Sequence, residues 1–318
     1  MSEQANYTHG HHASVVNSHA RRTAENSAAF LLPHIKPHHR ILDVGCGPGS
    51  ITMDLAALVP QGSVIGIDTS AEVLEQARAL AQARGAGNSD GNGNGNLTFQ
   101  QHDAAALPFA DGEFDVVFCH QVLHHARDPV AILREMARVA RKPSRGSGGS
   151  GDEGGGGGGG GGNGEGGIVA AREVDYRAVA WFPETPGLAR WAAVHERVFA
   201  ASSGGRTDSG RRLASWAREA GFGAGAATVG AGAAGVEEDD DAVTFSWSAW
   251  HYQREEARVW ADSWAERALR SGYATTALRE GIATLEELGE ISDAWRAWGA
   301  VEGAFIVIPS GEIVCRVR

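Results

Sequence analysis

Three glycines and a preceding acid form the first group of residues that could bind a ligand. Gly45, Gly47 and Gly49 alternate in DVGCGPGS, directly after a short apolar run. Such a loop brings backbone N–H groups against a ligand, and the positive end of the following helix favours an anionic group. Asp43, two residues before the first glycine, would repel a pyrophosphate but hold an ammonium group. We therefore expect the loop to bind a free amino-acid moiety, with its carboxylate at the N–H groups.

Two further acids follow the next two apolar runs. Asp68 ends VIGID, where a carboxylate can accept hydrogen bonds from both hydroxyls of a ribose. Asp103 follows NLTFQQH, where it can accept from an exocyclic amine such as that of adenine, while the N–H of Ala104 addresses a ring nitrogen. A dinucleotide site would place its third glycine at position 50, which is Ser50. An amino acid joined to a nucleoside therefore indicates S-adenosylmethionine rather than a nicotinamide dinucleotide.

The elements that position these residues alternate between strand and helix, which predicts an α/β fold with a parallel sheet and helices on both faces. Ser70 and Asp128 are the expected N-caps of two of the helices, and Pro33 is expected to end the first. The predicted strands cover 40–44, 63–67, 96–101, 113–120 and 167–174, and the predicted helices 12–32, 50–59, 70–84 and 128–141.

The second half of the chain has a different composition, with all nine tryptophans after residue 180. Helices are predicted over 255–269 and 284–298, a strand over 242–250, and two strand-like runs around a Pro-Ser-Gly turn over 304–317. Tryptophans at helical spacing mainly pack helices together. The alternative is that one or two of them line an apolar substrate pocket, and Trp181 and Trp191 are the better candidates.

Three segments interrupt the alternating pattern. Residues 85–96 lengthen a loop, 223–241 are acidic and glycine-rich, and the segment 143–167 contains nine consecutive glycines. Such tracts bury too little surface to offset their ordering entropy, so we predict flexible loops. The expected organisation is an N-terminal helical lid (1–39), a cofactor-binding half (40–142), a disordered inserted loop (143–167) and a second half of the same domain with substrate-side helical insertions (168–318).

Composition and charge narrow the class of protein. Apolar residues make up 42% of the 318 residues, so a sizeable core can be buried. The formal net charge of −11, with scattered Lys and Arg, argues against a nucleic-acid partner. Three cysteines suggest no disulfide framework and a reducing, cytoplasmic location. We see no signal peptide and no membrane span. His9, His11 and His12 have no partner acids nearby, so no metal site is predicted; this segment is expected to belong to the lid.

Together these motifs resemble the class I S-adenosylmethionine-dependent methyltransferases, and most closely the type 11, ubiquinone/menaquinone-biosynthesis-like branch. The matching pieces are ILDVGCGPGS, VIGIDTS, HDAAALPFADGEFDVVFCHQVLHHARDPVAILREMARV and GGIVAAREVDY. The resemblance implies a Rossmann-like, doubly wound seven-stranded sheet whose last strand is antiparallel. It also implies a cofactor site formed by Asp43, Gly45, Cys46, Gly47, Gly49, Asp68, Thr69, Asp103, Ala104, His120 and Gln121.

The expected reaction is transfer of a methyl group to a small-molecule, apolar or aromatic acceptor by in-line displacement. A base helps if the acceptor is a hydroxyl, and the candidates are His120, His124 and His125. His120 is the better candidate for a cofactor or pocket residue. The alternatives are a catalytically silent S-adenosylmethionine-binding regulatory protein and a nicotinamide-dependent oxidoreductase. The acceptor, the methylated atom and the oligomeric state do not follow from the sequence.

Overall fold

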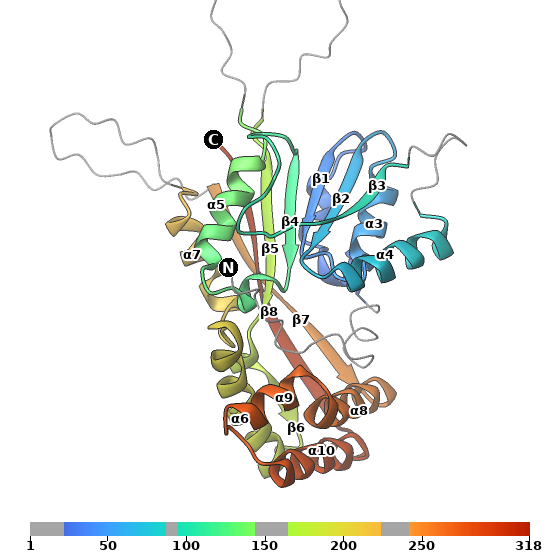
Figure 1. Ribbon diagram of the computed structural model, residues 1–318, viewed down its shortest axis with the longest axis vertical. Coiled ribbons are helices and arrows are strands. Elements are labelled where there is room, and N and C mark those ends of the chain that lie inside the picture. Colours follow the sequence, from blue (N-terminus) through green and yellow to red (C-terminus); the bar gives the residue numbers. More distant parts are fainter. Residues whose placement is uncertain (1–21, 87–94, 144–164, 224–241) are drawn as a thin grey trace, which may run out of the picture.

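The structure is a computed structural model that describes residues 22–86, 95–143, 165–223 and 242–318 (Figure 1). Several predictions fall outside these ranges. They concern the N-terminal histidines His9, His11 and His12, the first part of the helix expected over 12–32, and nearly all of the three interrupting segments.

Among the described residues, eight strands form one sheet in the order β3-β2-β1-β4-β5-β8-β6, with β7 also paired to β8. The first five are parallel, and β8 is antiparallel to β5, β6 and β7. The strands are β1 (Arg40–Val44), β2 (Ser63–Asp68), β3 (Leu97–Gln101), β4 (Val116–His120), β5 (Ile168–Val174), β6 (Ala180–Phe182), β7 (Val243–Gln253) and β8 (Phe305–Arg316). The predicted fold class is confirmed, and the short β6 is added to the expected seven strands.

Helices cover both faces of the sheet, because the central strands are apolar on both sides (Figure 1). One face packs against α2 (Ala24–Ser27) and α3 (Ser50–Leu58), the other against α5 (Pro129–Val139) and α7 (Leu213–Glu219). Beside β2 and β3 lies α4 (Ala71–Arg84). Parallel strands between two helical layers direct their carboxyl ends to one edge, which is where the predicted site residues lie.

The two predicted N-caps are confirmed. The Ser70 hydroxyl accepts a hydrogen bond from the N–H of Val73 at 3.3 Å, and the Asp128 carboxylate accepts from the N–H of Ala131 at 2.9 Å. These bonds satisfy N–H groups that have no partner within their own helix. They fix where α4 and α5 begin, and therefore where the loops before them meet the sheet.

Among the described residues, the helix predicted to continue to residue 32 ends at Ser27, so the prediction that Pro33 ends it is wrong. Within the described residues it covers only Ala24–Ser27, capped by Thr23, and Pro33 lies inside a separate 3-10 turn, η1 (Leu32–His34). Pro33 is the second residue of this turn, where an N–H would have no partner within the turn. Ala24, Ala28 and Leu31 nevertheless pack on the sheet, as their spacing suggested.

The predicted turn at Pro-Ser-Gly is wrong, because β8 runs through it without a break. Pro309 lies where the partner of β8 changes from β6 to β5, and its carbonyl accepts from the N–H of Asp175 at 2.9 Å. On the edge of β8 that pairs with β5 and β6, Pro309 lies between the residues paired with β6 and those paired with β5. The missing N–H of Pro309 therefore removes no hydrogen bond to either strand. A Cβ on Gly311 would lie 2.1 Å from the carbonyl oxygen of Gly210, so glycine here permits close packing.

The lower part of the β7–β8 ribbon carries a second, helical lobe (Figure 1). Its core is a tryptophan cluster in which Trp264, Trp295 and Trp298 are fully buried. This confirms the packing role predicted for tryptophans at helical spacing. The lobe contains α6 (Pro186–Ser203), α8 (Glu255–Arg270), α9 (Gly272–Arg279) and α10 (Leu285–Gly299).

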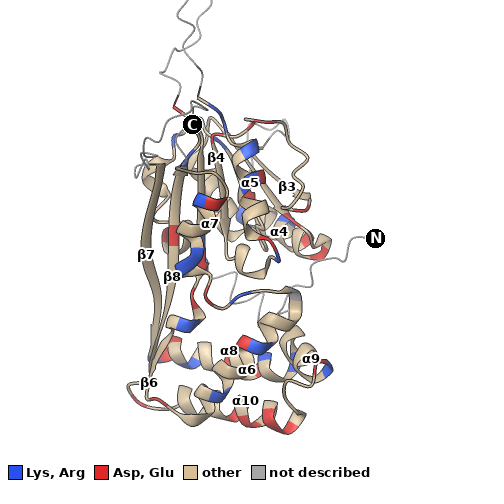
Figure 2. Ribbon diagram, turned by 90° about the vertical axis from the view of Figure 1, so that its left-hand side faces the viewer, with Lys and Arg blue, Asp and Glu red and all other residues tan. Residues whose placement is uncertain are grey.

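Three further features concern helix hydrophobicity, the cysteines and the distribution of charge. In the part of the chain that the structure describes, no helix is both long enough and apolar enough to span a membrane. Cys46, Cys119 and Cys315 are all free thiols. Figure 2 shows acidic and basic residues interspersed along the helices of both lobes.

Candidate active site

The glycine loop joins β1 to α3 and lies at the carboxyl edge of the sheet. Gly45, Gly47 and Gly49 all have positive φ angles, of 70°, 54° and 77°. At Gly45 a Cβ would lie 2.4 Å from Cγ2 of Val122, so a side chain is excluded there. At Gly47 nothing lies within 4 Å of the place where a Cβ would stand. The loop therefore presents bare backbone toward open space at Gly47, as a ligand-holding loop requires.

The structure brings the first two predicted acids together behind this loop. The Asp68 carboxylate accepts from the N–H of Gly47 at 3.1 Å and from the N–H of Ser70 at 3.0 Å. Asp43 is 2% exposed and accepts from the hydroxyl of Thr52 at 2.7 Å. Burial, with a smaller contribution from Asp68, raises the pKa of Asp43 to about 7. A cationic group placed here would favour the ionised form of Asp43.

The third acid lies further along the same edge. Asp103 is exposed and its carboxylate accepts from the N–H of Ala105 at 2.9 Å, while Ala104 is half-buried. The backbone carbonyl of Thr69 accepts from the side-chain amide of Gln101 at 2.8 Å, which ties the ends of β2 and β3 together. Asp43 near the end of β1, Asp68 at the end of β2 and Asp103 after β3 thus belong to three adjacent strands.

The end of β4 carries His120 and Gln121. Gln121 has a φ of 55°, and its backbone N–H donates to the carbonyl of Arg172 at 2.8 Å. Its side-chain oxygen accepts from the Arg22 guanidinium at 2.7 Å. The N-terminal segment therefore reaches over the same edge of the sheet and contacts the residue beside the glycine loop.

His120 belongs to a buried polar network beneath this edge. Arg172, 1% exposed, donates to Nε2 of His120 at 3.0 Å and to the carboxylate of Glu312 at 3.2 Å. The Arg172 guanidinium lies 4.5 Å from the ring centre of Trp250. Burial lowers the pKa of Arg172 to about 10, opposed by Glu312, so Arg172 stays protonated at neutral pH. Because a guanidinium only donates, Nε2 of His120 is the acceptor and its proton is on Nδ1.

His124 forms a second buried pair, with Glu173. Its Nδ1 lies 2.6 Å from a Glu173 carboxylate oxygen, and both side chains are at most 3% exposed. The Glu173 carboxylate also accepts from the N–H groups of Val122, Leu123 and His124, at 2.8, 2.7 and 3.2 Å. It thereby caps the 3-10 turn η2 (Leu123–His125).

The proton arrangement of this pair follows from its donors. Burial lowers the pKa of His124 and raises the pKa of Glu173. The three backbone N–H groups favour the ionised form of Glu173 against the effect of burial, and in that form the carboxylate accepts from Nδ1–H of His124. A neutral imidazole held in this way keeps its lone pair on Nε2, the arrangement of a general base.

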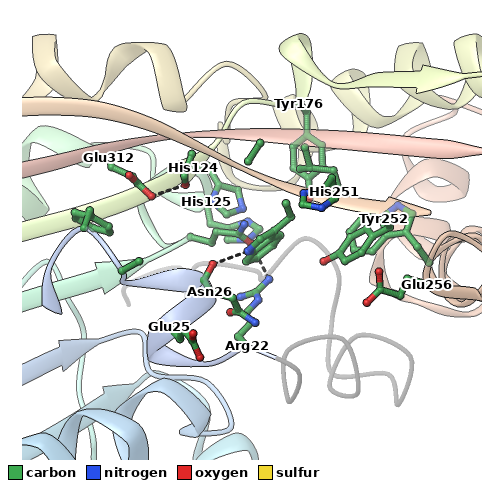
Figure 3. A pocket seen from close by; sticks show the side chains of 18 of the residues that line it. Arg22, Glu25, Asn26, His124, His125, Tyr176, His251, Tyr252, Glu256 and Glu312 are labelled. Carbon is green, nitrogen blue, oxygen red and sulfur yellow. Dashed lines mark hydrogen bonds between the residues drawn. The ribbon is translucent and has the colours of Figure 1, made fainter. Parts of the chain in front are cut away.

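A cavity of about 510 Å³ lies between the N-terminal segment, the end of β4, the β7 strand and α8. Figure 3 shows His124 and His125 above Asn26 and Arg22, with Tyr252 and Glu256 on the right. The indole N–H of Trp250 donates to the carbonyl of Asn26 at 2.8 Å and so closes the wall beside the N-terminal segment. Aromatic rings form much of this wall, contributed by Phe30, Tyr176, Trp250, Tyr252 and Trp260.

The pocket tryptophans differ from those predicted. Trp191 is 2% exposed inside the tryptophan cluster, and Trp181 packs edge-on against it, with ring centres 6.2 Å apart. Neither lines the cavity, which Trp250 and Trp260 do instead. Helical spacing alone could not separate Trp260 from Trp264, because both lie on the same side of α8, and Trp264 is buried by Trp191 of α6 and Trp295 of α10.

Sequence reasoning also missed the charged residues Arg172, Glu173 and Glu312. The signal was present in VAAREV and PSGEIV, where charges interrupt runs that read as buried strand. A buried charge needs a partner, so each such residue indicates a polar network. No group of three or more His, Cys, Asp or Glu among the described residues is arranged to hold a metal ion.

Comparisons with known proteins agree with this geometry. Residues 35–147 match the family model described as a methyltransferase domain. An uncharacterized methyltransferase of Schizosaccharomyces pombe, C1B3.06c, is 29% identical over 98% of this chain and 97% of its own length. The ubiquinone/menaquinone biosynthesis C-methyltransferase UbiE of Bdellovibrio bacteriovorus is 33% identical over 33% of this chain and 41% of its own length. The structure of Bacillus subtilis YcgJ is similar with a TM-score of 0.50 and 18% identity, covering 92% of this chain and 99% of that one, which bears on the fold alone.

A mostly parallel sheet with antiparallel last strands, and a glycine loop after its first strand, define the Rossmann-like fold of methyltransferases. The match within residues 35–147 and the relatives named as methyltransferases support a class I S-adenosylmethionine-dependent methyltransferase of the type 11 branch.

Proposed function

We propose that this methyltransferase transfers the methyl group of S-adenosylmethionine to a small aromatic or otherwise apolar acceptor bound in the cavity of Figure 3. The observation that carries the proposal is that His124, oriented by Glu173, lies in the wall of an aromatic cavity at the carboxyl end of β4. That edge of the sheet also carries the glycine loop and the acids that would hold the cofactor. The acceptor and the cofactor would therefore meet there.

The residues of the loop fit the cofactor's polar groups. The backbone of Gly45 and Gly47 would hold the carboxylate and Asp43 the ammonium group of its methionine part. Asp68 keeps lone pairs free for two ribose hydroxyls although it already accepts two N–H bonds. The adenine would lie at Asp103 and Ala104. The remaining members of the proposed cofactor site are Cys46, Gly49, Thr69, His120 and Gln121.

Arg22 is a further candidate that the sequence did not single out. Its guanidinium holds Gln121 next to the glycine loop and lies 5.4 Å from the ring centre of Trp250. From this position it can place a positive charge over the methionine end of the cofactor. We therefore include Arg22 among the groups that would bind the cofactor's carboxylate.

Among the three predicted bases, His120, His124 and His125, the geometry favours His124, because Glu173 orients its ring. The lone pair of His120 is already used by Arg172, whereas Nδ1–H of His124 donates to Glu173 and leaves Nε2 able to take a proton. When bound, S-adenosylmethionine supplies an electrophilic methyl group that the acceptor takes by in-line displacement. His124 would take the proton of an acceptor hydroxyl, and the Glu173 carboxylate would stabilise the imidazolium that results. The aromatic wall keeps water away from both.

The test is transfer of labelled methyl from S-adenosylmethionine to a panel of phenolic acceptors. We expect wild type to transfer, and His124→Gln to lower kcat by about 10²–10⁴-fold. His124→Gln should bind S-adenosylhomocysteine with unchanged affinity. His38→Gln, at an exposed position, is the matched control. An unchanged kcat in His124→Gln would remove the base assignment. No transfer to any acceptor, with intact cofactor binding, would favour a catalytically silent binding protein.

A further inference from the structure

Tyr176 contributes a hydroxyl group to the aromatic wall of the cavity. It begins the 3-10 turn η3 (Tyr176–Ala178), which follows β5 after one residue, and it lines the cavity. Figure 3 shows Tyr176 at the top of the view and Arg22 at the bottom. Because β5 also carries Glu173, the carboxyl end of one strand supplies both this tyrosine and the carboxylate that orients His124.

The ring of Tyr176 is held by buried neighbours on α6. Its centre lies 4.4 Å from that of His195, in an edge contact, and 5.9 Å from that of Phe199. Phe199 also stacks on His124, with ring centres 5.6 Å apart. Tyr176 and the candidate base therefore pack against the same buried ring, which fixes both of them in neighbouring parts of the cavity wall.

The hydroxyl of Tyr176 makes no hydrogen bond within the part of the chain that the structure describes, and it is not one of the fully buried atoms that lack a partner. The hydroxyl of Tyr273, by contrast, is fully buried and has no partner among the same residues. An oxygen that is neither bonded nor enclosed borders open space, and the open space beside Tyr176 is the cavity that it lines. The Tyr176 hydroxyl can therefore bond to a molecule in the cavity.

The charges around this hydroxyl decide which kind of group it suits. Burial raises the pKa of Tyr176, so the hydroxyl keeps its proton at neutral pH and can donate it to a hydrogen bond. Arg267 and Arg22 oppose this rise, because positive charge favours negative charge at the oxygen, and Glu173 has a smaller effect of the opposite sign. Such surroundings favour an electron-rich oxygen as the partner, and a carbonyl oxygen, which only accepts, fits the donor.

We propose that Tyr176 selects the acceptor by donating a hydrogen bond from its hydroxyl to a carbonyl oxygen of the acceptor. The inference rests on the proposed function in taking the cavity of Figure 3 as the acceptor site. The acceptor is then an aromatic compound with two oxygen functions. One is the hydroxyl that gives its proton to His124 and takes the methyl group, and the other is a carbonyl held by Tyr176. A compound without the carbonyl leaves the Tyr176 hydroxyl unpaired, so the site discriminates against it.

The first experiment compares ligands on the wild-type protein saturated with S-adenosylhomocysteine. The probes are the positional isomers of hydroxyphenyl and hydroxynaphthyl methyl ketone. Each is paired with its isopropenyl counterpart, in which a CH2 group replaces the carbonyl oxygen, so that the shape is kept and the hydrogen-bond acceptor is lost. We expect at least one ketone to bind about three- to tenfold more tightly than its alkene in calorimetry. If no ketone binds more tightly than its alkene, the inference is wrong.

Tyr176→Phe removes the hydroxyl and keeps the ring. It should bind the preferred ketone about three- to tenfold more weakly than wild type, and the alkene with unchanged affinity. Tyr273→Phe is the matched control, because it removes a tyrosine hydroxyl that is buried outside the cavity lining. This control should keep the wild-type preference for the ketone.

The melting temperature of Tyr176→Phe should equal that of wild type, because the lost hydroxyl has no partner among the described residues. A lower melting temperature together with an equal loss for ketone and alkene would mean that Tyr176 only shapes the wall, and would overturn the inference. An unchanged ketone preference in Tyr176→Phe would overturn it as well.

The result can be separated from the proposed function. Tyr176→Phe should bind S-adenosylhomocysteine with wild-type affinity, because the glycine loop and the acids beside it would hold the cofactor. Suppose that methyl is transferred to ketones and alkenes, and that the ratio of their kcat/KM values is the same in wild type and Tyr176→Phe. The proposed function would then stand and this inference would fall. A ketone preference that depends on Tyr176, without methyl transfer to any phenol, would do the reverse.

Discussion

Asp43 should make the protein less stable than an uncharged residue would at neutral pH. Its carboxyl group is buried and its pKa is raised from 3.8 to about 7, chiefly by burial. A difference of about 3 in pKa corresponds to about 4 kcal/mol, at about 1.4 kcal/mol per pH unit. Because the folded pKa lies above the unfolded one, folding favours the neutral acid. This stabilisation is complete below about pH 4, is lost as the pH rises to about 7, and stays lost above it.

Asp43→Asn tests this directly, because asparagine is neutral at every pH and can still accept from Thr52. We expect the free energy of unfolding of the variant to exceed that of wild type by up to about 4 kcal/mol at pH 8, and by under about 1 kcal/mol at pH 4. Urea unfolding across this range, without cofactor, measures both curves. Asp262→Asn, at an exposed position, is the control and should follow wild type.

The reasoning would be refuted if the free energies of unfolding of wild type and Asp43→Asn differed by the same amount at every pH from 4 to 8. A constant difference would mean that the pKa of Asp43 is the same in the folded and unfolded states. The same variant should bind S-adenosylhomocysteine more weakly than wild type. If Asp43→Asn is more stable than wild type but binds S-adenosylhomocysteine more weakly, the negative charge of Asp43 serves ligand binding rather than folding stability.

Three further predictions concern the glycine loop, the acid after β2 and the packing of β8. Asp68→Ala should weaken S-adenosylhomocysteine binding at least about tenfold in calorimetry, because it removes a charged acceptor; unchanged affinity would remove Asp68 from the site. Gly45→Ala places a Cβ 2.4 Å from Val122 at a φ of 70°, so it should lower the melting temperature and cofactor affinity, and Val122→Ala should restore only the part due to the clash. Gly311→Ala places a Cβ 2.1 Å from the Gly210 carbonyl, so soluble yield and unfolding free energy should both fall; a native melting temperature would contradict the packing described.

Much of the cofactor-binding half could be predicted because its signals are local. The strand at 40–44 coincides with β1, and the Ser70 and Asp128 caps begin α4 and α5 where expected. An apolar run, a cap or an alternating glycine depends on neighbours a few residues away. The acids at the strand ends could be placed together for the same reason, once a parallel sheet was assumed.

The acceptor side could not be predicted, because it depends on long-range pairing. Pro309 and Gly311 have the composition of a turn, yet β7 pairs with both and β5 pairs with Gly311, which holds this part of β8 extended. Trp250 and Arg267 come from a strand and a helix that only the fold brings beside His124. Glu173 could have been noticed as a charge in a buried strand, but its partner could not have been named.

The continuous β8 strand has a consequence for how fast the protein folds. It pairs with β5, β6 and β7, and 140 residues separate Arg172 from its partner Glu312. Closing so long a loop costs entropy before its contacts are gained, whereas β1 to β4 pair over shorter separations. We expect the docking of β8 to limit the folding rate. The half that carries the glycine loop would then assemble before the wall of the cavity that we propose as the acceptor site.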